Sequence, residues 1–78
     1  MIYMEKYRII ETDIINAIQT GKIKPGEKLP GEVELCEKYN VSRVTVRKAI
    51  LNLASAGKVY RRAGDGTYVS EKPYVNTT

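Results

Sequence analysis

The chain has 78 residues, of which 42% are hydrophobic, and it carries a net charge of +4. This length allows one small domain and excludes a barrel enzyme or a doubly wound nucleotide-binding fold. The chain has one cysteine and no histidine. This composition excludes a disulfide framework and a multi-thiolate zinc site, and it removes the commonest general base of enzymes.

The positive charge is concentrated in the second half of the chain. Residues 1–40 have six basic and seven acidic side chains, whereas residues 41–78 have seven basic and two acidic ones. Such asymmetry indicates a surface that meets an anionic partner. The sequence has neither the apolar run of a signal peptide nor the roughly 20 apolar residues of a membrane span. We therefore expect a cytoplasmic protein with no membrane partner.

The first half of the chain predicts two helices. The first runs from about Tyr3 to Thr20 and carries a helical stripe of apolar residues, which Ile9 and Ile15 widen. A loop with two prolines follows, and we expect a short extended piece in it at Ile23. The second helix begins just after Pro30. Glu32 and Glu34 lie in its first turn, where carboxylates are favoured by the positive end of the helix dipole. Asn40 is the predicted terminator of this helix.

The third helix has the clearest start signal. Ser42 is a suitable N-cap, and its oxygen can accept the amide of Val44 or Thr45. The apolar residues that face inward are Val46, Ala49, Ile50 and Leu53, and Gly57 ends the helix. Because only residues 40–42 separate the second and third helices, the two form a helix-turn-helix.

Beyond Gly57 the pattern changes to that of strands. Residues 59–62 and 67–70 are rich in β-branched and aromatic side chains, and the turn signal Ala63-Gly64-Asp65-Gly66 separates them. An isolated hairpin is not stable in water, so this one must pack on the helices. The predicted fold is α+β and mainly α, a winged helix-turn-helix over residues 1–70. Residues 71–78 are predicted to be a linker or tail.

This arrangement predicts contacts to double-stranded DNA. The second helix of such a motif lies in the major groove, and its outward side offers Arg43, Val44, Arg47 and Lys48. An arginine can bond O6 and N7 of guanine at once, so Arg43 and Arg47 are candidate base readers. The hydroxyls of Ser42 and Thr45 suit phosphate oxygens.

The hairpin adds a second candidate contact. Arg61 and Arg62 precede its turn, and Gly64 and Gly66 shape the tip. A narrow minor groove attracts cations and admits a backbone without side chains. The alternative is an ordinary turn that needs glycine for its backbone conformation.

The single cysteine, Cys36, lies in the second predicted helix and is expected to be a small buried hydrophobe.

Several motifs together resemble the DNA-binding domain of GntR-type bacterial transcriptional regulators. The matching segments are Leu29-Pro30-Gly31-Glu32, Val41 to Ile50, Gly57, Arg61-Arg62 and Gly64 to Val69. The resemblance implies a repressor or activator that binds a palindromic operator as a homodimer at the bacterial nucleoid. It also implies a carboxyl-terminal domain that dimerises and binds a small-molecule effector, and residues 71–78 would lead to that domain.

The resemblance completes the predicted interface. The predicted base contacts are Arg43, Val44 and Arg47. The predicted phosphate contacts are Gly31, Ser42, Thr45, Lys48 and Arg62. The predicted wing contacts in the minor groove are Gly64, Gly66 and Thr67. Two departures from the family pattern fall on the second helix: Gly31 replaces the usual serine, and Val33 replaces a residue that is polar in many members.

Two other classes of function are weaker alternatives. A winged helix can serve protein–protein contact, and its basic face is then incidental. An enzyme is not expected, because the sequence has no nucleophile elbow and no phosphate-binding loop. No cofactor and no metal are expected.

Overall fold

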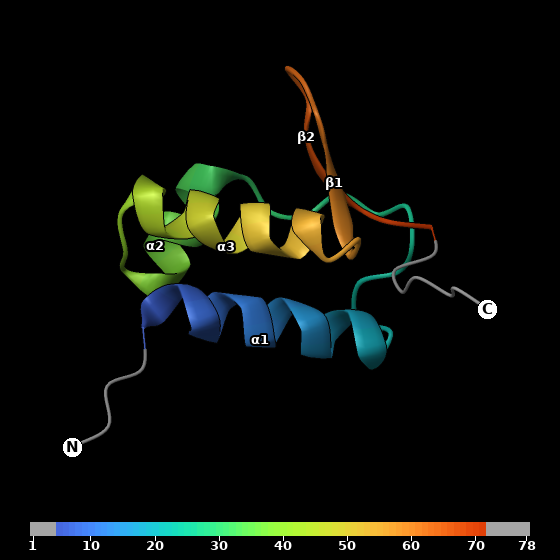
Figure 1. Ribbon diagram of the computed structural model, residues 1–78, viewed down its shortest axis with the longest axis horizontal. Helices are drawn as coiled ribbons and strands as arrows, with labels where there is room; N and C mark the ends of the chain where they lie inside the picture. The colour runs from blue at the N-terminus through green and yellow to red at the C-terminus, as the bar shows by residue number, and fades with distance from the viewer. Residues whose placement is uncertain (1–4, 72–78) are drawn as a thin grey trace.

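The structure, a computed structural model, describes residues 5–71 as three helices followed by an antiparallel hairpin (Figure 1). The elements are α1 (Lys6–Gln19), α2 (Glu32–Tyr39), α3 (Arg43–Ser55), β1 (Val59–Arg62) and β2 (Gly66–Val69). Helices α1 and α3 pack on each other, and the hairpin rises beside the end of α3 (Figure 1). The predicted winged helix-turn-helix is confirmed.

Local hydrogen bonds fix the turn between α2 and α3. Asn40 adopts a left-handed conformation with φ of 56°, and the amide of Val41 donates to the carbonyl of Cys36 at 3.1 Å. This geometry closes α2 as predicted. Two residues later, Ser42 Oγ accepts the amide of Thr45 at 3.4 Å and begins α3. The turn therefore sets the angle at which α3 leaves α2.

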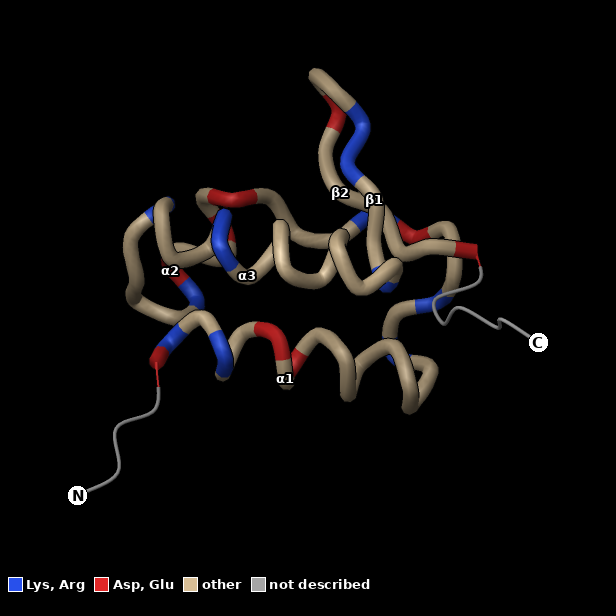
Figure 2. Tube along the Cα trace, in the orientation of Figure 1, with Lys and Arg blue, Asp and Glu red and all other residues tan. Residues whose placement is uncertain are grey.

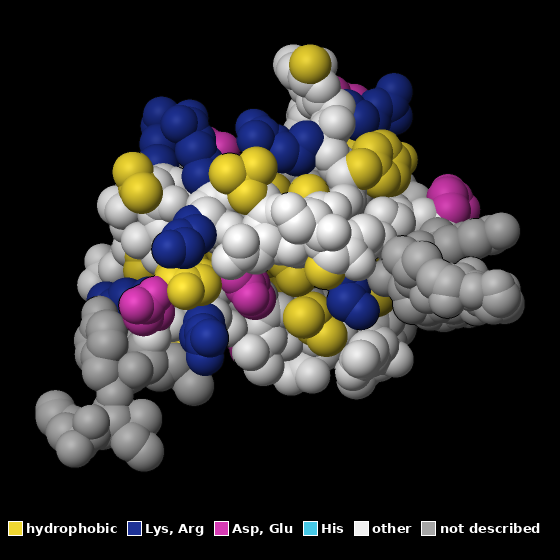
Figure 3. Space-filling view, viewed as in Figure 1, with side chains coloured by type: hydrophobic (Ala, Val, Ile, Leu, Met, Phe, Trp, Pro, Cys, Tyr) yellow, Lys and Arg dark blue, Asp and Glu magenta, His cyan; other side chains and the backbone are white. Residues whose placement is uncertain are grey.

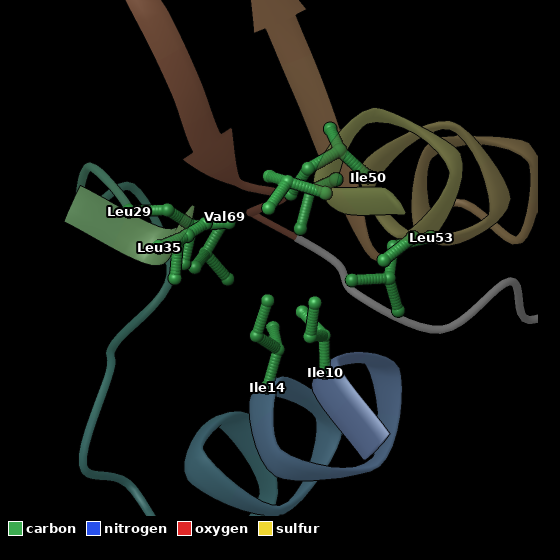
Figure 4. Close-up of a cluster of buried hydrophobic side chains, with 10 residues drawn as sticks. Ile10, Ile14, Leu29, Leu35, Ile50, Leu53 and Val69 are labelled. Carbon is green, nitrogen blue, oxygen red and sulfur yellow. The ribbon is translucent and has the colours of Figure 1, made fainter. Parts of the chain in front are cut away.

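The core joins all three helices to the base of the hairpin (Figure 4). Each buried aliphatic side chain contributes about 1.5–3 kcal/mol. The hairpin supplies Val59 and Val69, so its base is part of the core although its tip is not. The ten buried apolar residues are Ile10, Ile14, Leu29, Leu35, Val46, Ala49, Ile50, Leu53, Val59 and Val69.

The loop between α1 and α2 runs beside β2 as a third extended segment. The amide of Leu29 donates to the carbonyl of Thr67 at 2.8 Å, and the amide of Val69 donates to the carbonyl of Glu27 at 2.9 Å. Lys28 forms a bridge with Tyr68. The extended piece expected at Ile23 therefore lies at Lys28 instead. The prediction was wrong because its partner, β2, is distant in the sequence.

Several predicted boundaries and environments need correction. Helix α1 is described from Lys6, with Glu5 at its N-cap; Tyr3 and residues 72–78 lie outside the described residues. Ile9 is 40% exposed rather than packed. Strand β2 begins one residue earlier than expected, because Gly66 pairs with Arg62.

The remaining findings concern Cys36 and the membrane. Cys36 is half-buried beside the core instead of fully enclosed. Within residues 5–71 no helix has the length and apolar character needed to span a bilayer.

Candidate nucleic-acid interface

The outward face of α3 carries the three predicted base readers together. Arg43 and Arg47 are exposed one turn apart, and Val44 between them has 74% of its surface exposed. The opposite face of the helix buries the core residues, so these three side chains point away from the domain. The helix has no acidic residue. This face therefore offers two guanidinium groups and one apolar contact to an external ligand.

Arg47 is held by an acidic side chain of the neighbouring helix. Its Nε donates to Glu32 Oε2 at 3.1 Å, and both side chains are partly exposed. Surface pairs of this kind contribute about 0–1 kcal/mol, so the pair orients Arg47 more than it stabilises the fold. The contact uses Nε, and a guanidinium can still present its two terminal Nη groups to O6 and N7 of guanine.

Glu32 was not predicted as a functional residue. In the sequence it is one of several carboxylates at the start of α2, where the helix dipole alone explains an acidic residue. Fifteen residues separate it from Arg47, and only the crossing of α2 and α3 brings the two together. No spacing rule within a single helix could have found this pair.

The predicted phosphate contacts at the two helix starts differ in their geometry. Ser42 and Thr45 lie at the first turn of α3, with their hydroxyl oxygens 3.3 Å apart. Ser42 is exposed, whereas Thr45 is half-buried. Gly31 is the N-cap of α2 and supplies no side-chain bond to that helix. The start of α2 therefore keeps more free amides than the start of α3.

Lys48 lies apart from the arginines of α3. Its Nζ is 4.5 Å from the centroid of the Tyr7 ring on α1. Such cation–π contacts contribute about 0.5–1 kcal/mol at exposed sites. Lys48 is exposed one turn after Val44, and its ammonium group reaches toward α1. Its contact with phosphate stays a prediction.

The wing combines cations with one acidic residue at its tip (Figure 2). Asp65 accepts a hydrogen bond from the hydroxyl of Tyr68 at 2.9 Å. Its carboxylate also lies 3.5 Å from Lys28 Nζ and 3.8 Å from Arg62 Nε. The Tyr68 hydrogen bond, followed by the charges of Lys28 and Arg62, lowers the pKa of Asp65. The same hydrogen bond raises the pKa of Tyr68.

Neither Lys28 nor Asp65 was predicted to be a functional residue. Lys28 lies in a loop that showed no nucleic-acid signal. The register of β2 beside residues 26–29 brings it to the wing. Asp65 was counted only as a turn residue. Arg62 and Tyr68 each lie three residues from Asp65, and this spacing is a signal for local contacts. It could not show the direction in which these side chains point.

The glycines of the tip have distinct roles. Gly64 has a φ of +74°, a conformation that tight turns use and that glycine adopts readily. No other atom lies within 4 Å of the position that a Cβ atom would take there. Gly66 has φ of +150°, and a Cβ atom there would lie 2.6 Å from Lys28 Cε. The structure thus gives a reason for glycine at position 66 within the protein itself, beside the predicted approach to DNA. Thr67 is half-buried and pairs with Arg61 across the hairpin.

A groove separates the start of α2 from the wing. Its lining includes Gly31, Glu32, Glu34, Arg61, Arg62 and Gly66. Lysine and arginine side chains gather along the edge of the molecule from which the wing rises (Figure 3). Among the described residues no cluster of carboxylates, cysteine or histidine could hold a metal ion. The second helix of this motif lies in the major groove, and the basic wing rises beside the end of α3 (Figure 1).

Three comparisons with known proteins agree with this geometry. The family model described as bacterial regulatory proteins, gntR family, matches residues 6–69. The HTH-type transcriptional regulator YurK of Bacillus subtilis is 50% identical over 87% of this chain and 26% of its own length. The arabinose metabolism transcriptional repressor of Halalkalibacterium halodurans is 43% identical over 86% of this chain and 18% of its own length.

The solved structures include a complex with DNA. The crystal structure of AraR(DBD) with operator ORE1 is 43% identical, with a TM-score of 0.84, over 87% of this chain and 83% of that one. The chain spans about a quarter or less of the length of the two curated relatives named above. The matches are to transcriptional regulators and not to enzymes. The chain belongs to the gntR family of bacterial regulatory proteins, and its winged helix is the DNA-binding domain of that family.

Proposed function

We propose that this domain recognises operator DNA through the outward face of α3, with the wing in the adjacent minor groove. The observation that carries the proposal is the grouping of Arg43, Val44 and Arg47 on one exposed helix face beside the arginines of β1. The two arginines read guanine, and Val44 contacts a thymine methyl group. Ser42, Thr45, Gly31, Lys48 and Arg62 contact phosphate.

The wing supports recognition through its tip. Gly64 and Gly66 bring backbone to the floor of the minor groove, and Thr67 follows them on β2. The exposed Arg61 and Arg62 supply the positive charge that a narrow minor groove attracts. The relative AraR(DBD), which is bound to an operator in its crystal structure, supports a DNA-bound state of this domain.

The whole protein is proposed to be a ligand-responsive repressor of the bacterial cytoplasm, acting at the nucleoid. Residues 1–70 are its operator-recognition domain, and residues 71–78 lead to a domain that dimerises and binds a small-molecule effector. The homodimer then places two winged helices on a palindromic operator. Two curated relatives that the chain resembles, the arabinose metabolism repressor and NagR of Bacillus subtilis, support the repressor role.

The decisive experiment measures DNA binding against salt concentration. The domain should bind random duplex DNA at low salt, and the logarithm of the binding constant should fall linearly with the logarithm of the salt concentration. Selection from random sequences should then enrich one half-site. The matched control is the double variant Arg43→Ala and Arg47→Ala, which should keep phosphate binding and lose the enrichment. A wild-type domain without affinity for DNA would contradict the proposal and favour the protein-interaction alternative.

A further inference from the structure

The carboxylate of Asp65 lies between two cations of the wing region, Lys28 and Arg62. It lies 3.5 Å from Lys28 Nζ and 3.8 Å from Arg62 Nε, and these cations come from different segments of the chain. Both cations are about half exposed, with 50% and 57% of the side chain accessible. They are therefore within reach of an external anion while they pair with an internal one.

The hydrogen bonds that Asp65 makes within the wing are shorter than its ion pairs with the two cations. The Tyr68 hydroxyl donates to Asp65 at 2.9 Å, and the Asp65 amide donates to the Arg62 carbonyl at 2.9 Å. The two ion pairs are longer and exposed, and pairs of this kind are weak and screened by salt. An arriving phosphate can consequently take the cations, whereas the carboxylate stays at the tip.

Neighbouring residues direct both cations to this place. The Lys28 side chain crosses Gly66, where a Cβ atom would lie 2.6 Å from Lys28 Cε. Arg62 lies over the ring of Tyr68, with 5.1 Å from its guanidinium carbon to the ring centroid. Tyr68 in turn stacks on Tyr60 at 5.8 Å between ring centroids. The tip is thus built around one carboxylate and two cations.

We infer that Asp65 is an internal counterion of the wing, which pairs with Lys28 and Arg62 in the free domain and must release them to DNA phosphate. The inference rests on the proposed DNA-binding function. Its consequence is a limit on affinity for DNA that lacks an operator. Binding to such DNA depends almost entirely on phosphate contacts, and these two cations are partly neutralised before DNA arrives.

The test is Asp65→Asn, measured on a 20-base-pair duplex of random sequence across a range of salt concentrations. The amide oxygen of asparagine can still accept the Tyr68 hydrogen bond, so the turn is retained while the charge is removed. We expect affinity to rise about three-fold to ten-fold at low salt. The slope of log K against log salt should steepen by about 0.9, the value for one further neutralised phosphate.

A double-variant background separates release of the cations from simple repulsion of DNA. In the variant with Lys28→Gln and Arg62→Gln, Asp65→Asn should raise affinity less than two-fold. Glu34→Gln is the charge-matched control. Glu34 lines the same groove and forms no ion pair with the described residues. An equal gain in both backgrounds, an equal gain from Glu34→Gln, or no gain from Asp65→Asn would overturn the inference.

A measurement on the free domain distinguishes this inference from the proposed function. Carboxyl NMR titration of the wild type should give Asp65 a pKa below the ordinary value of 3.8, and Lys28→Gln should raise it. A wild-type domain that binds no random DNA refutes the proposed function, whatever this titration shows. A domain that binds DNA while Asp65 titrates identically in wild type and Lys28→Gln refutes only the role of Asp65. Melting curves of each variant confirm that it is folded.

Discussion

In the proposed function, Arg47 reads a base while Glu32 accepts a hydrogen bond from its Nε atom. We expect Arg47→Ala to cost about 1–3 kcal/mol on the preferred operator and to relax the choice at one base pair. Arg43→Ala should do the same at an adjacent position, whereas Thr45→Ala should weaken all sequences alike. Titration of a panel of operators with single-base changes measures this. Equal losses across the panel for Arg47→Ala would contradict its role in reading a base.

Val44 provides a test at the level of one methyl group. If it contacts thymine, replacement of that thymine by uracil removes a buried methyl, which contributes about 0.8 kcal/mol, or roughly four-fold in affinity. The same replacement should matter less to Val44→Ala, which has lost the partner atoms. Uracil substitution at each thymine of the selected half-site, one at a time, locates the contact. If no position distinguishes the two proteins, Val44 does not contact a thymine.

Gly66 is constrained within the protein and is also a predicted contact to DNA. Any side chain there must displace Lys28 and accept a φ of +150°, and aspartate adds repulsion from phosphate. Gly66→Asp should lower the melting temperature only slightly, because the tip lies outside the core. Its affinity for DNA should fall ten-fold or more, roughly 1.4 kcal/mol.

Gly66→Asn is the matched control, since asparagine has nearly the same size as aspartate and no charge. Its affinity should lie between those of glycine and aspartate. Melting curves and DNA titrations on the same samples separate folding from binding. If Gly66→Asp melts and binds as the parent does, the tip does not enter the minor groove.

Between elements, the contact of α2 with α1 has a measurable pH dependence. Tyr39 of α2 donates a hydrogen bond to Asp13 of α1 at 2.8 Å. Burial, followed by this hydrogen bond, raises the pKa of Tyr39 to about 12 from an ordinary value of 10.0. A raised pKa in the folded state means that the neutral hydroxyl stabilises the fold. This stabilisation is complete below pH 10 and is lost as the pH rises from about 10 to about 12.

In Tyr39→Phe, the free energy of unfolding should therefore decrease less over this pH range than it does in the wild type. Urea denaturation at a series of pH values measures the difference. Asp13→Asn retains an acceptor and removes the negative charge, so it should show an intermediate slope. A wild type and a Tyr39→Phe variant with parallel pH profiles would show that the hydrogen bond does not form in solution.

At the scale of the whole molecule, affinity should depend on the number of winged helices that are joined. We expect residues 1–78 to be mainly monomeric and to bind one half-site weakly. A tandem of two copies with a flexible linker should bind a palindrome far more tightly, because the second binding event becomes intramolecular. Sedimentation of the single domain is the direct check. A stable dimer at micromolar concentration would place a dimer interface within these 78 residues.

The sequence predicted the features that depend on near neighbours. The cap at Ser42, the left-handed Asn40 and the glycine-rich tip all have signals within a few residues, and each lies where it was expected. The outward face of α3 followed from helical periodicity. Local signals of this kind were enough for the fold and for most of the candidate interface.

The features that the sequence did not reveal depend on contacts between distant segments. Glu32 reaches Arg47 across two helices, and Lys28 reaches Asp65 across the wing. Ion pairs of this sort leave no periodic pattern, because each partner is an ordinary surface residue in its own segment. The contact of Lys48 with the ring of Tyr7 was not predicted for a related reason: the two residues are more than 40 positions apart in the chain.

The third extended segment also affects how the domain behaves at high concentration. Residues 26–29 cover one edge of β2, and β1 covers the other. Of the two strands in the described residues, β1 is the one that keeps an edge without a partner. That edge is four residues long and carries Arg61 and Arg62. Short, positively charged edges resist pairing with strands of other molecules. The wing arginines therefore protect the domain against aggregation, quite apart from any role in binding.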